Sequence, residues 1–180
     1  MNILRFAMFF MICSNVYAEQ FDQHVPLSKH GASTFYVTGS IEGFGSAELL
    51  VDTGSGYVTL DEETFAILNK SGKAQYIKQL RGTMADGSER IVPIYRIAGI
   101  ELGGKCYVSD VEVAIFPKKT RLILGLSALR KVSPFIFSMD DPPSLKLSNC
   151  GSPAAGARES LNLHQDQPST ESNTEKRKEL

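Results

Sequence analysis

The sequence predicts a mostly β, single-domain protein, and three observations lead to this prediction. Residues 34–147 are dense in short runs of β-branched and aromatic residues. Turn-forming residues separate these runs, including an Asp-Gly pair and a Gly-Gly pair that are typical of hairpins. Helical patterning is confined to two brief stretches, 64–68 and 126–131. A length of 180 residues, 42% apolar and 22% charged, suits one domain with flanking segments.

The first predicted hairpin leads to the most informative residue of the chain. Residues 35–41 and 47–51 are rich in β-type side chains, and the glycine-containing segment 42–46 between them is typical of a hairpin loop. The second strand closes with three consecutive apolar residues, which predicts burial. This buried strand therefore delivers Asp52 to its end.

A short strand and a short helix are expected next. Residues 57–60 have the composition of a strand. Thr59 and Glu62 have the spacing of a capping box ahead of the amphipathic stretch 64–68, which predicts that a helix starts there. Residues 69–76 match no motif.

Two further hairpins are predicted in the middle of the chain. Residues 79–84 and 89–97 flank the tetrapeptide 85–88, whose Asp-Gly pair favours a tight turn and makes this hairpin a candidate flap. Residues 97–102 lead into a Gly-Gly turn, and the chain returns through 105–116, where β-branched residues are frequent.

The last part of the domain combines a short apolar strand with a helix and a closing hairpin. Residues 122–125 are apolar and end in glycine, which predicts a buried strand. A brief helix over 126–131 follows, and a Ser-Pro pair ends it. Residues 135–139 and 145–147 are expected to be closing strands.

Both ends of the chain differ in composition from the domain. Residues 1–18 combine a basic start, an apolar stretch and a small-x-small motif, which is typical of a signal peptide and predicts an exported protein, periplasmic or secreted. An uncleaved segment would instead contact the membrane as an anchor, although its apolar run is shorter than the roughly twenty residues of a span. We expect a polar, irregular segment over 19–33, the domain over 34–150 and a disordered polar tail over 151–180.

Two cysteines, Cys106 and Cys150, remain after removal of the signal peptide. In an oxidising compartment they are expected to form one disulfide, which would tie the end of the last strand to the body of the domain. Two unpaired, small hydrophobic residues are the alternative.

Composition argues against several other classes of function. A net charge of −1 and the lack of a basic run with interleaved aromatic residues give no reason to expect nucleic-acid binding. His24, His30 and His164 lie in polar flanking segments without the spacing of metal ligands. We therefore expect no metal and no cofactor.

Asp52, Thr53 and Gly54 form a D-T-G triplet at the end of the predicted buried strand. A carboxylate on a rigid turn suits hydrolysis when it faces a second carboxylate across a water molecule, because the two groups then share one proton. This chain contains one D-[ST]-G triplet, so such a site needs two chains related by a two-fold axis. A tight turn without chemistry is the alternative, since Asp and Gly both favour turns.

Three elements, in this order, resemble the retropepsin-like aspartic proteases, and most closely the exported or membrane-anchored bacterial members. They are D-T-G-S-G at 52–56, A-D-G at 85–87 in a hairpin, and an apolar-apolar-Gly strand at 123–125 before a short helix. The resemblance covers about 34–147 and implies a closed β-barrel with a flap hairpin and one or two short helices. It also implies that a single domain acts as a homodimer.

The resemblance assigns roles to the residues of the D-T-G-S-G turn. Asp52 would be the catalytic carboxylate, and Thr53 would bond to the partner's matching turn across the dimer axis. Gly54 would let the two turns approach closely, because it has no Cβ atom. Ser55 would hydrogen-bond to the outer oxygen of Asp52, and Gly56 would complete the turn.

The other matched residues would surround that turn. Ala85, Asp86 and Gly87 would form the tip of a mobile flap that closes over a peptide substrate. Gly125 would pack beneath the active-site turn. Ile123 and Leu124, which precede it, would be core residues of the strand.

The sequence therefore predicts a homodimeric aspartic endopeptidase that acts on peptide or protein substrates. A non-catalytic, exported module that binds an extended peptide in the same groove is the alternative function. A monomer with a single Asp52 is a further alternative.

Overall fold

The computed structural model describes residues 21–31 and 33–153. The predicted signal peptide over 1–18 and nearly all of the predicted tail over 151–180 lie outside these residues. Among the described residues, no helix is long and apolar enough to cross a membrane. The strands are β1 (Gln23–Pro26), β2 (Ser28–His30), β3 (Thr34–Ile41), β4 (Gly45–Val51), β5 (Val58–Asp61), β6 (Ala74–Thr83), β7 (Glu89–Leu102), β8 (Cys106–Phe116), β9 (Ile123–Leu124), β10 (Phe135–Ser138) and β11 (Ser144–Leu147). The helices are α1 (Glu62–Lys70), α2 (Leu126–Leu129) and the 3-10 helix η1 (Arg130–Val132).

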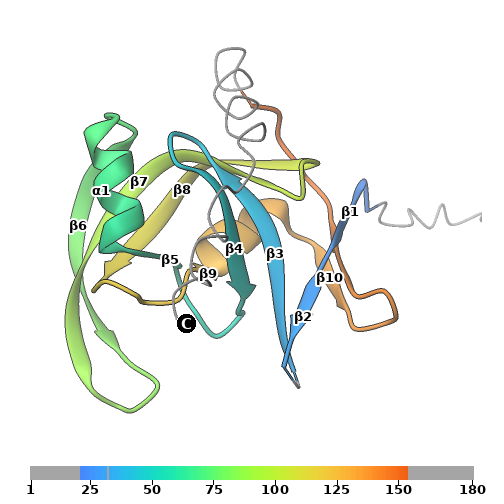
Figure 1. Ribbon diagram of the computed structural model, residues 1–180, viewed down its shortest axis with the longest axis horizontal. Helices are drawn as coiled ribbons and strands as arrows, with labels where there is room; N and C mark the ends of the chain where they lie inside the picture. Colours follow the sequence, from blue (N-terminus) through green and yellow to red (C-terminus); the bar gives the residue numbers. More distant parts are fainter. Residues whose placement is uncertain (1–20, 32, 154–180) are drawn as a thin grey trace, which may run out of the picture.

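Eight strands form one sheet in the order β2-β3-β4-β9-β5-β8-β7-β6. A further antiparallel pairing joins β3 to β7, with Gly39 opposite Leu102, so the sheet closes on itself. This pairing closes a ring of strands whose interior side chains fill, while β2 and β6 remain as outer strands with one neighbour each. The predicted closed β-barrel is therefore confirmed, and Figure 1 shows its strands curving around a common centre.

The core lies inside this barrel, and it is formed because buried and more exposed residues alternate along the strands. β7 and β8 place every second residue inward over much of their length, since successive side chains of a strand point to opposite faces. The fully buried large side chains come from most elements of the barrel and from α1 and α2; they are Ile41, Leu49, Leu60, Leu68, Ile94, Ile97, Ile100, Leu102, Leu124, Leu129, Leu145 and Leu147. All of these residues except Ile94 belong to one connected core, and Ile94 belongs to a second, smaller cluster on β7 and β8.

The two predicted central hairpins share a strand. Residues 89–97 and 97–102 form one continuous strand, β7, which pairs with β6 over residues 89–97 and with β8 over residues 94–102. β6 also begins at Ala74, so the segment 69–76 that matched no motif contains the end of α1 and the start of a strand. The boundary at residue 97 was wrong because no turn residue interrupts the chain there.

Helix α1 is longer than the predicted stretch 64–68, and its cap differs. Asp61 is the N-cap, and its Oδ1 accepts a hydrogen bond of 2.9 Å from the backbone N–H of Thr64. Thr59, the predicted capping residue, lies buried in β5 instead. The capping-box prediction was wrong because the strand continues past Thr59.

The segment 19–33 is not irregular as predicted, because it contributes two strands. β1 pairs with β11 and β2 pairs with β3, both antiparallel. Val25 and Leu27 are buried in the core, so the folded domain begins before residue 34. Its polar side chains are mostly exposed, while the pairing uses backbone N–H and C=O groups and so does not require apolar side chains.

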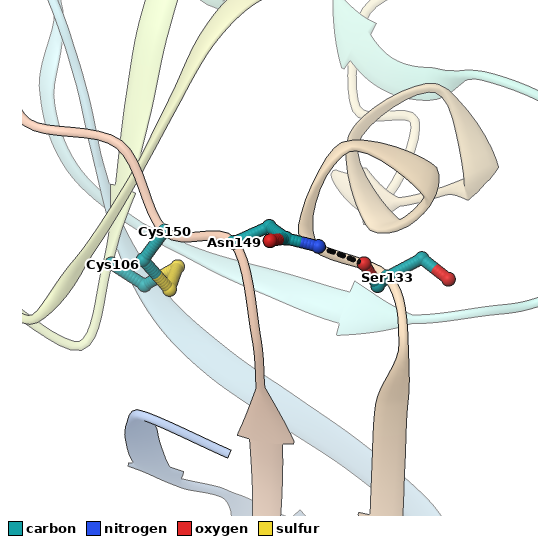
Figure 2. The surroundings of a disulfide bond; sticks show 4 residues. All are labelled: Cys106, Ser133, Asn149 and Cys150. Carbon is teal, nitrogen blue, oxygen red and sulfur yellow. Dashed lines mark hydrogen bonds between the residues drawn. A yellow bond between two sulfur atoms is a disulfide. The ribbon is translucent and has the colours of Figure 1, made fainter. Parts of the chain in front are cut away.

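The closing part of the chain forms a second sheet in the order β1-β11-β10. Just after β11, the sulfur atoms of Cys150 and Cys106 form a disulfide across a separation of 44 residues. Figure 2 shows this bond beside the hydrogen bond in which the Asn149 side-chain amide donates to the Ser133 carbonyl. The end of the domain is thus fastened both to β8 and to the segment after η1.

A buried polar cluster closes the end of the β3–β4 hairpin. Glu42 is 6% exposed, and its carboxylate accepts hydrogen bonds from the Tyr107 hydroxyl at 2.8 Å and from the Lys73 ammonium at 3.1 Å. Burial, followed by the hydrogen bond to Glu42 and the charge of Glu42, raises the pKa of the Tyr107 phenol. The folded protein therefore favours the neutral phenol.

This cluster gives a pH-dependent prediction. Because the pKa is raised on folding, the contribution of Tyr107 is fully present below about pH 10 and is lost as pH rises above that value. We expect Tyr107→Phe to lower the free energy of unfolding by about 1.5 kcal/mol at neutral pH. It should also flatten the decline in stability above about pH 10.

Urea unfolding at several pH values would measure both effects, with the exposed Tyr76→Phe as the control. A Tyr107→Phe variant whose stability falls as steeply with alkaline pH as that of the wild type would contradict this assignment.

Candidate active site

Two strands that pass side by side place Asp52 at the edge of the barrel. β4 pairs in parallel with β9, with Leu50 opposite Ile123 and Val51 opposite Leu124. The backbone N–H of Asp52 continues this pairing and donates to the Leu124 carbonyl at 3.2 Å. The backbone position of Asp52 is therefore set by a buried strand from a distant part of the chain, as the predicted strand 122–125 implied.

The turn after β4 holds the carboxylate of Asp52 through its own backbone. The N–H of Gly54 donates to Asp52 Oδ1 at 2.8 Å, and the N–H of Ser55 donates to the Asp52 carbonyl at 3.3 Å. Asp52 is half-buried, whereas Thr53 and Gly54 are exposed. The site thus presents an oriented carboxylate at a surface that other molecules can reach.

The family resemblance implied that the hydroxyl of Ser55 would bond to the carboxylate of Asp52. The structure shows a different partner. The hydroxyl donates instead to the backbone carbonyl of Tyr57 at 2.8 Å. That carbonyl lies two residues further along the turn, within reach of a short side chain that bends back to its own backbone. In the single chain, the Gly54 N–H orients the carboxylate, and Ser55 stabilises the exit of the turn.

Gly125 lies directly beneath the turn. A Cβ atom at this position would lie 2.9 Å from the Ser55 carbonyl oxygen and closer still to the Tyr57 carbonyl oxygen. The next residue, Leu126, donates its backbone N–H to the Ser55 carbonyl at 2.8 Å. A residue without a side chain is therefore required for this close approach.

The candidate flap is the β6–β7 hairpin, whose tip contains Ala85, Asp86 and Gly87. Ser88 donates to Asp86 Oδ1 through its hydroxyl at 2.6 Å and its N–H at 2.9 Å, and these bonds lower the pKa of Asp86. Gly87 has a φ of +80°, which suits glycine. All three tip residues are exposed, and Figure 1 shows the hairpin projecting as a loop at the lower left of the molecule.

An apolar cluster links the strands of the flap hairpin to the active-site turn. Val92 and Ile94 of β7 are buried together with Ala114 of β8. Tyr57, the residue just after the turn, and Leu80 of β6 pack against them. The sequence did not reveal this cluster, because its members lie on separate strands that come together only in the folded barrel.

Ser127 is a second residue that sequence reasoning missed. Its hydroxyl accepts a hydrogen bond of 2.8 Å from the Val58 N–H and donates one of 2.6 Å to the Glu112 carbonyl. The sequence shows only a serine in a short helix, and no local pattern signals these long-range partners.

The part of the chain that the structure describes contains no cluster of metal-binding side chains. Within residues 21–31 and 33–153, no three His, Cys, Asp or Glu side chains are grouped so as to hold a metal ion.

Comparison with known proteins agrees with this geometry. The family model of the gag-polyprotein putative aspartyl proteases matches residues 37–131, which is more than half of the chain. A crystal structure of a retropepsin-like aspartic protease from Rickettsia conorii is similar in fold, with a TM-score of 0.51 and 16% sequence identity. The match covers 70% of this chain and 91% of that one. A search among curated proteins found no match. The chain therefore belongs to the family of gag-polyprotein putative aspartyl proteases and has the retropepsin-like fold.

Proposed function

We propose that this protein is a homodimeric aspartic endopeptidase, in which one Asp52 from each of two chains activates a water molecule. The observation that carries the proposal is the placement of Asp52. Its carboxylate lies at the end of a buried strand, is held by the Gly54 N–H at 2.8 Å and remains partly open to solvent. Family membership supports a peptidase with the same chemistry.

Two carboxylates are needed because the reaction moves protons in both directions. One ionised Asp52 removes a proton from the water, whose oxygen attacks the carbonyl carbon of the scissile peptide bond. The other Asp52, protonated, donates its proton to the carbonyl oxygen. When the tetrahedral intermediate collapses, the C–N bond breaks and the Asp52 that took the water proton gives it to the departing amine. The other Asp52, now ionised, takes a proton back from a hydroxyl of the intermediate as the product carbonyl forms. The pair ends, as it began, with one proton between them.

The exposed part of the turn suits contact with a second chain. Thr53 and Gly54 are exposed in the single chain and lie beside the oriented carboxylate. In the proposed dimer, Thr53 bonds to the partner's turn, Gly54 lets the turns approach, and Gly56 leaves space around the exit. Without that partner, the site holds a single D-T-G carboxylate and lacks the second carboxylate that the proposed reaction needs.

The flap residues Ala85, Asp86 and Gly87 are proposed to close over the peptide and exclude water from the reaction. A turn closed by its own hydrogen bonds can move as a unit on its two strands, which supports this role. The substrate is proposed to be an extended peptide, since an extended strand fits between a hairpin and a sheet edge.

We further propose that the protein is exported, to the periplasm or outside the cell. The predicted signal peptide over 1–18 motivates this location. The disulfide between Cys106 and Cys150 supports it, because such bonds persist in oxidising compartments. Membrane contact is expected where the signal segment stays attached.

Digestion of an unfolded protein by the purified chain, from acidic to neutral pH, tests the proposal. Because a dimer supplies the site, the cleavage rate per chain should rise with chain concentration until the dimer is saturated. Light scattering on the same samples should show dimers over the same range of concentration. A folded dimer that cleaves nothing would favour the alternative of a peptide-binding module, and a cleavage rate per chain that is independent of concentration would contradict the shared site.

A further inference from the structure

The Ser127 hydroxyl lies where three elements meet just below the active-site turn. Ser127 is the second residue of α2, and its hydroxyl bridges the N–H of Val58 in β5 and the carbonyl of Glu112 in β8. The two bonds measure 2.8 Å and 2.6 Å. One hydroxyl therefore uses both its donor and an acceptor site, and it satisfies two backbone groups from different strands.

Val58 is the first residue of β5 and directly follows the turn. β5 pairs in parallel with β8, starting with Val58 opposite Val113, so the Ser127 hydroxyl sits at the first step of this pairing. The hydroxyl thus bonds to the residue at which the chain leaves the turn and enters the barrel.

The turn is consequently held at its two ends in different ways. At its start, the Asp52 N–H bonds to the Leu124 carbonyl, and in its middle the Ser55 carbonyl accepts from the Leu126 N–H. Both of these are backbone bonds, which side-chain substitution leaves in place. At its exit, the bond to Val58 comes from a side chain, so this support can be removed by a single substitution.

We propose that Ser127 is a positioning residue for catalysis, which acts through Val58 and the turn on the carboxylate of Asp52. This inference rests on the proposed function. A two-fold axis repeats any shift of the turn in the partner, so the separation of the two carboxylates changes by up to twice the shift in one chain. A shift of the turn that a site within one chain would tolerate therefore changes the distance between the two Asp52 carboxylates, which share one proton and one water molecule in the proposed dimer.

Removing the hydroxyl with Ser127→Ala should lower kcat about ten- to hundredfold, because displacements near 1 Å have effects of this size. KM should stay within about twofold, since both partners of the Ser127 hydroxyl are backbone groups of the barrel. The pH–rate profile should also move, because the coupling of two carboxylates depends on their separation. These rates are measured at a chain concentration that saturates the dimer.

The isosteric pair Ser127→Thr and Ser127→Val isolates the hydroxyl from side-chain volume. Threonine retains the donor and the acceptor, so it should preserve kcat to within about threefold, whereas valine should behave like alanine. This pair also decides the matter if the alanine variant does not fold.

Ser71→Ala is the matched control. The Ser71 hydroxyl also donates to a backbone carbonyl, that of Leu68 at 2.9 Å, but at the end of α1 and away from the turn. This variant should keep the wild-type kcat and pH profile. An equal loss of kcat in Ser71→Ala and Ser127→Ala would show a general effect of stability and would overturn the proposal.

Amide hydrogen exchange gives a readout that does not depend on cleavage. Exchange at the Gly54 N–H, which bonds to the Asp52 carboxylate, should accelerate in Ser127→Ala and stay unchanged in Ser71→Ala. Wild-type kcat, or unchanged exchange at Gly54, in a folded Ser127→Ala variant would overturn the proposal. If the wild type itself cleaves nothing, the proposed function fails, whereas the exchange measurement still decides whether Ser127 positions the turn.

Discussion

Replacing Asp52 with asparagine is expected to abolish peptide cleavage while leaving the fold and the dimer intact. The amide has the same shape as the carboxylate, and its oxygen can still accept the 2.8 Å hydrogen bond from the Gly54 N–H. It cannot take a proton from water, so the cleavage rate should fall at least about a thousandfold. The free energy of unfolding should change by less than about 1 kcal/mol, because Asp52 is half-buried and keeps this partner.

The matched control for this variant is Asp61→Asn. Asp61 caps helix α1 through a hydrogen bond to the Thr64 N–H, and asparagine caps helices about as well as aspartate. Cleavage and stability should therefore both stay close to those of the wild type. Cleavage by Asp52→Asn at the wild-type rate would rule out Asp52 as the catalytic group. If the Asp52→Asn variant did not fold, the carboxylate would instead have a structural role.

Replacing Gly125 with alanine is expected to cause the largest loss of stability among the substitutions considered. The new Cβ atom would lie 2.9 Å from the Ser55 carbonyl oxygen and closer to that of Tyr57. Both oxygens are backbone atoms, one in the turn and one just after it, so neither can rotate away as a flexible side chain would. We expect the free energy of unfolding to fall by about 3 kcal/mol or more.

Activity should be lost in the same variant, even where it remains folded. The turn has to move away from the methyl group, and this shift carries Asp52 out of its working position. Urea unfolding and cleavage assays would measure the two effects separately. Gly56→Ala is the control for stability, because a Cβ atom there meets nothing within 4 Å, and its free energy of unfolding should change by less than about 0.5 kcal/mol. Equal stability of Gly125→Ala and the wild type would contradict the close packing described above.

Features that depend on neighbouring residues were predictable from the sequence. The strand that ends in Asp52, the Asp-Gly turn of the flap and the apolar strand before Gly125 all appear in the structure where their local patterns placed them. Turn residues and alternation act over a few positions, so they can be read without knowledge of the fold. The same local signals carried the resemblance to the retropepsin-like proteases.

Features that depend on competition between distant groups were predicted less well. Val25 and Leu27 gave too little apolar content to signal strands, yet the edges of β11 and β3 supplied backbone partners for β1 and β2. Ser55 was expected to bond to Asp52, whereas the Tyr57 carbonyl takes its hydroxyl. In each case the outcome was set by which partner the folded chain brought nearest.

The sequence by itself determined the β class and the position of Asp52 at a strand end, and its one D-T-G triplet is the reason that we propose a second chain. The tertiary structure decided what supports that carboxylate. Val58 and Ser127 are 69 residues apart, and Cys106 and Cys150 are 44 apart, yet each pair is joined in the barrel. Such contacts arise only when strands from different parts of the chain are packed around one core, so no local pattern encodes them.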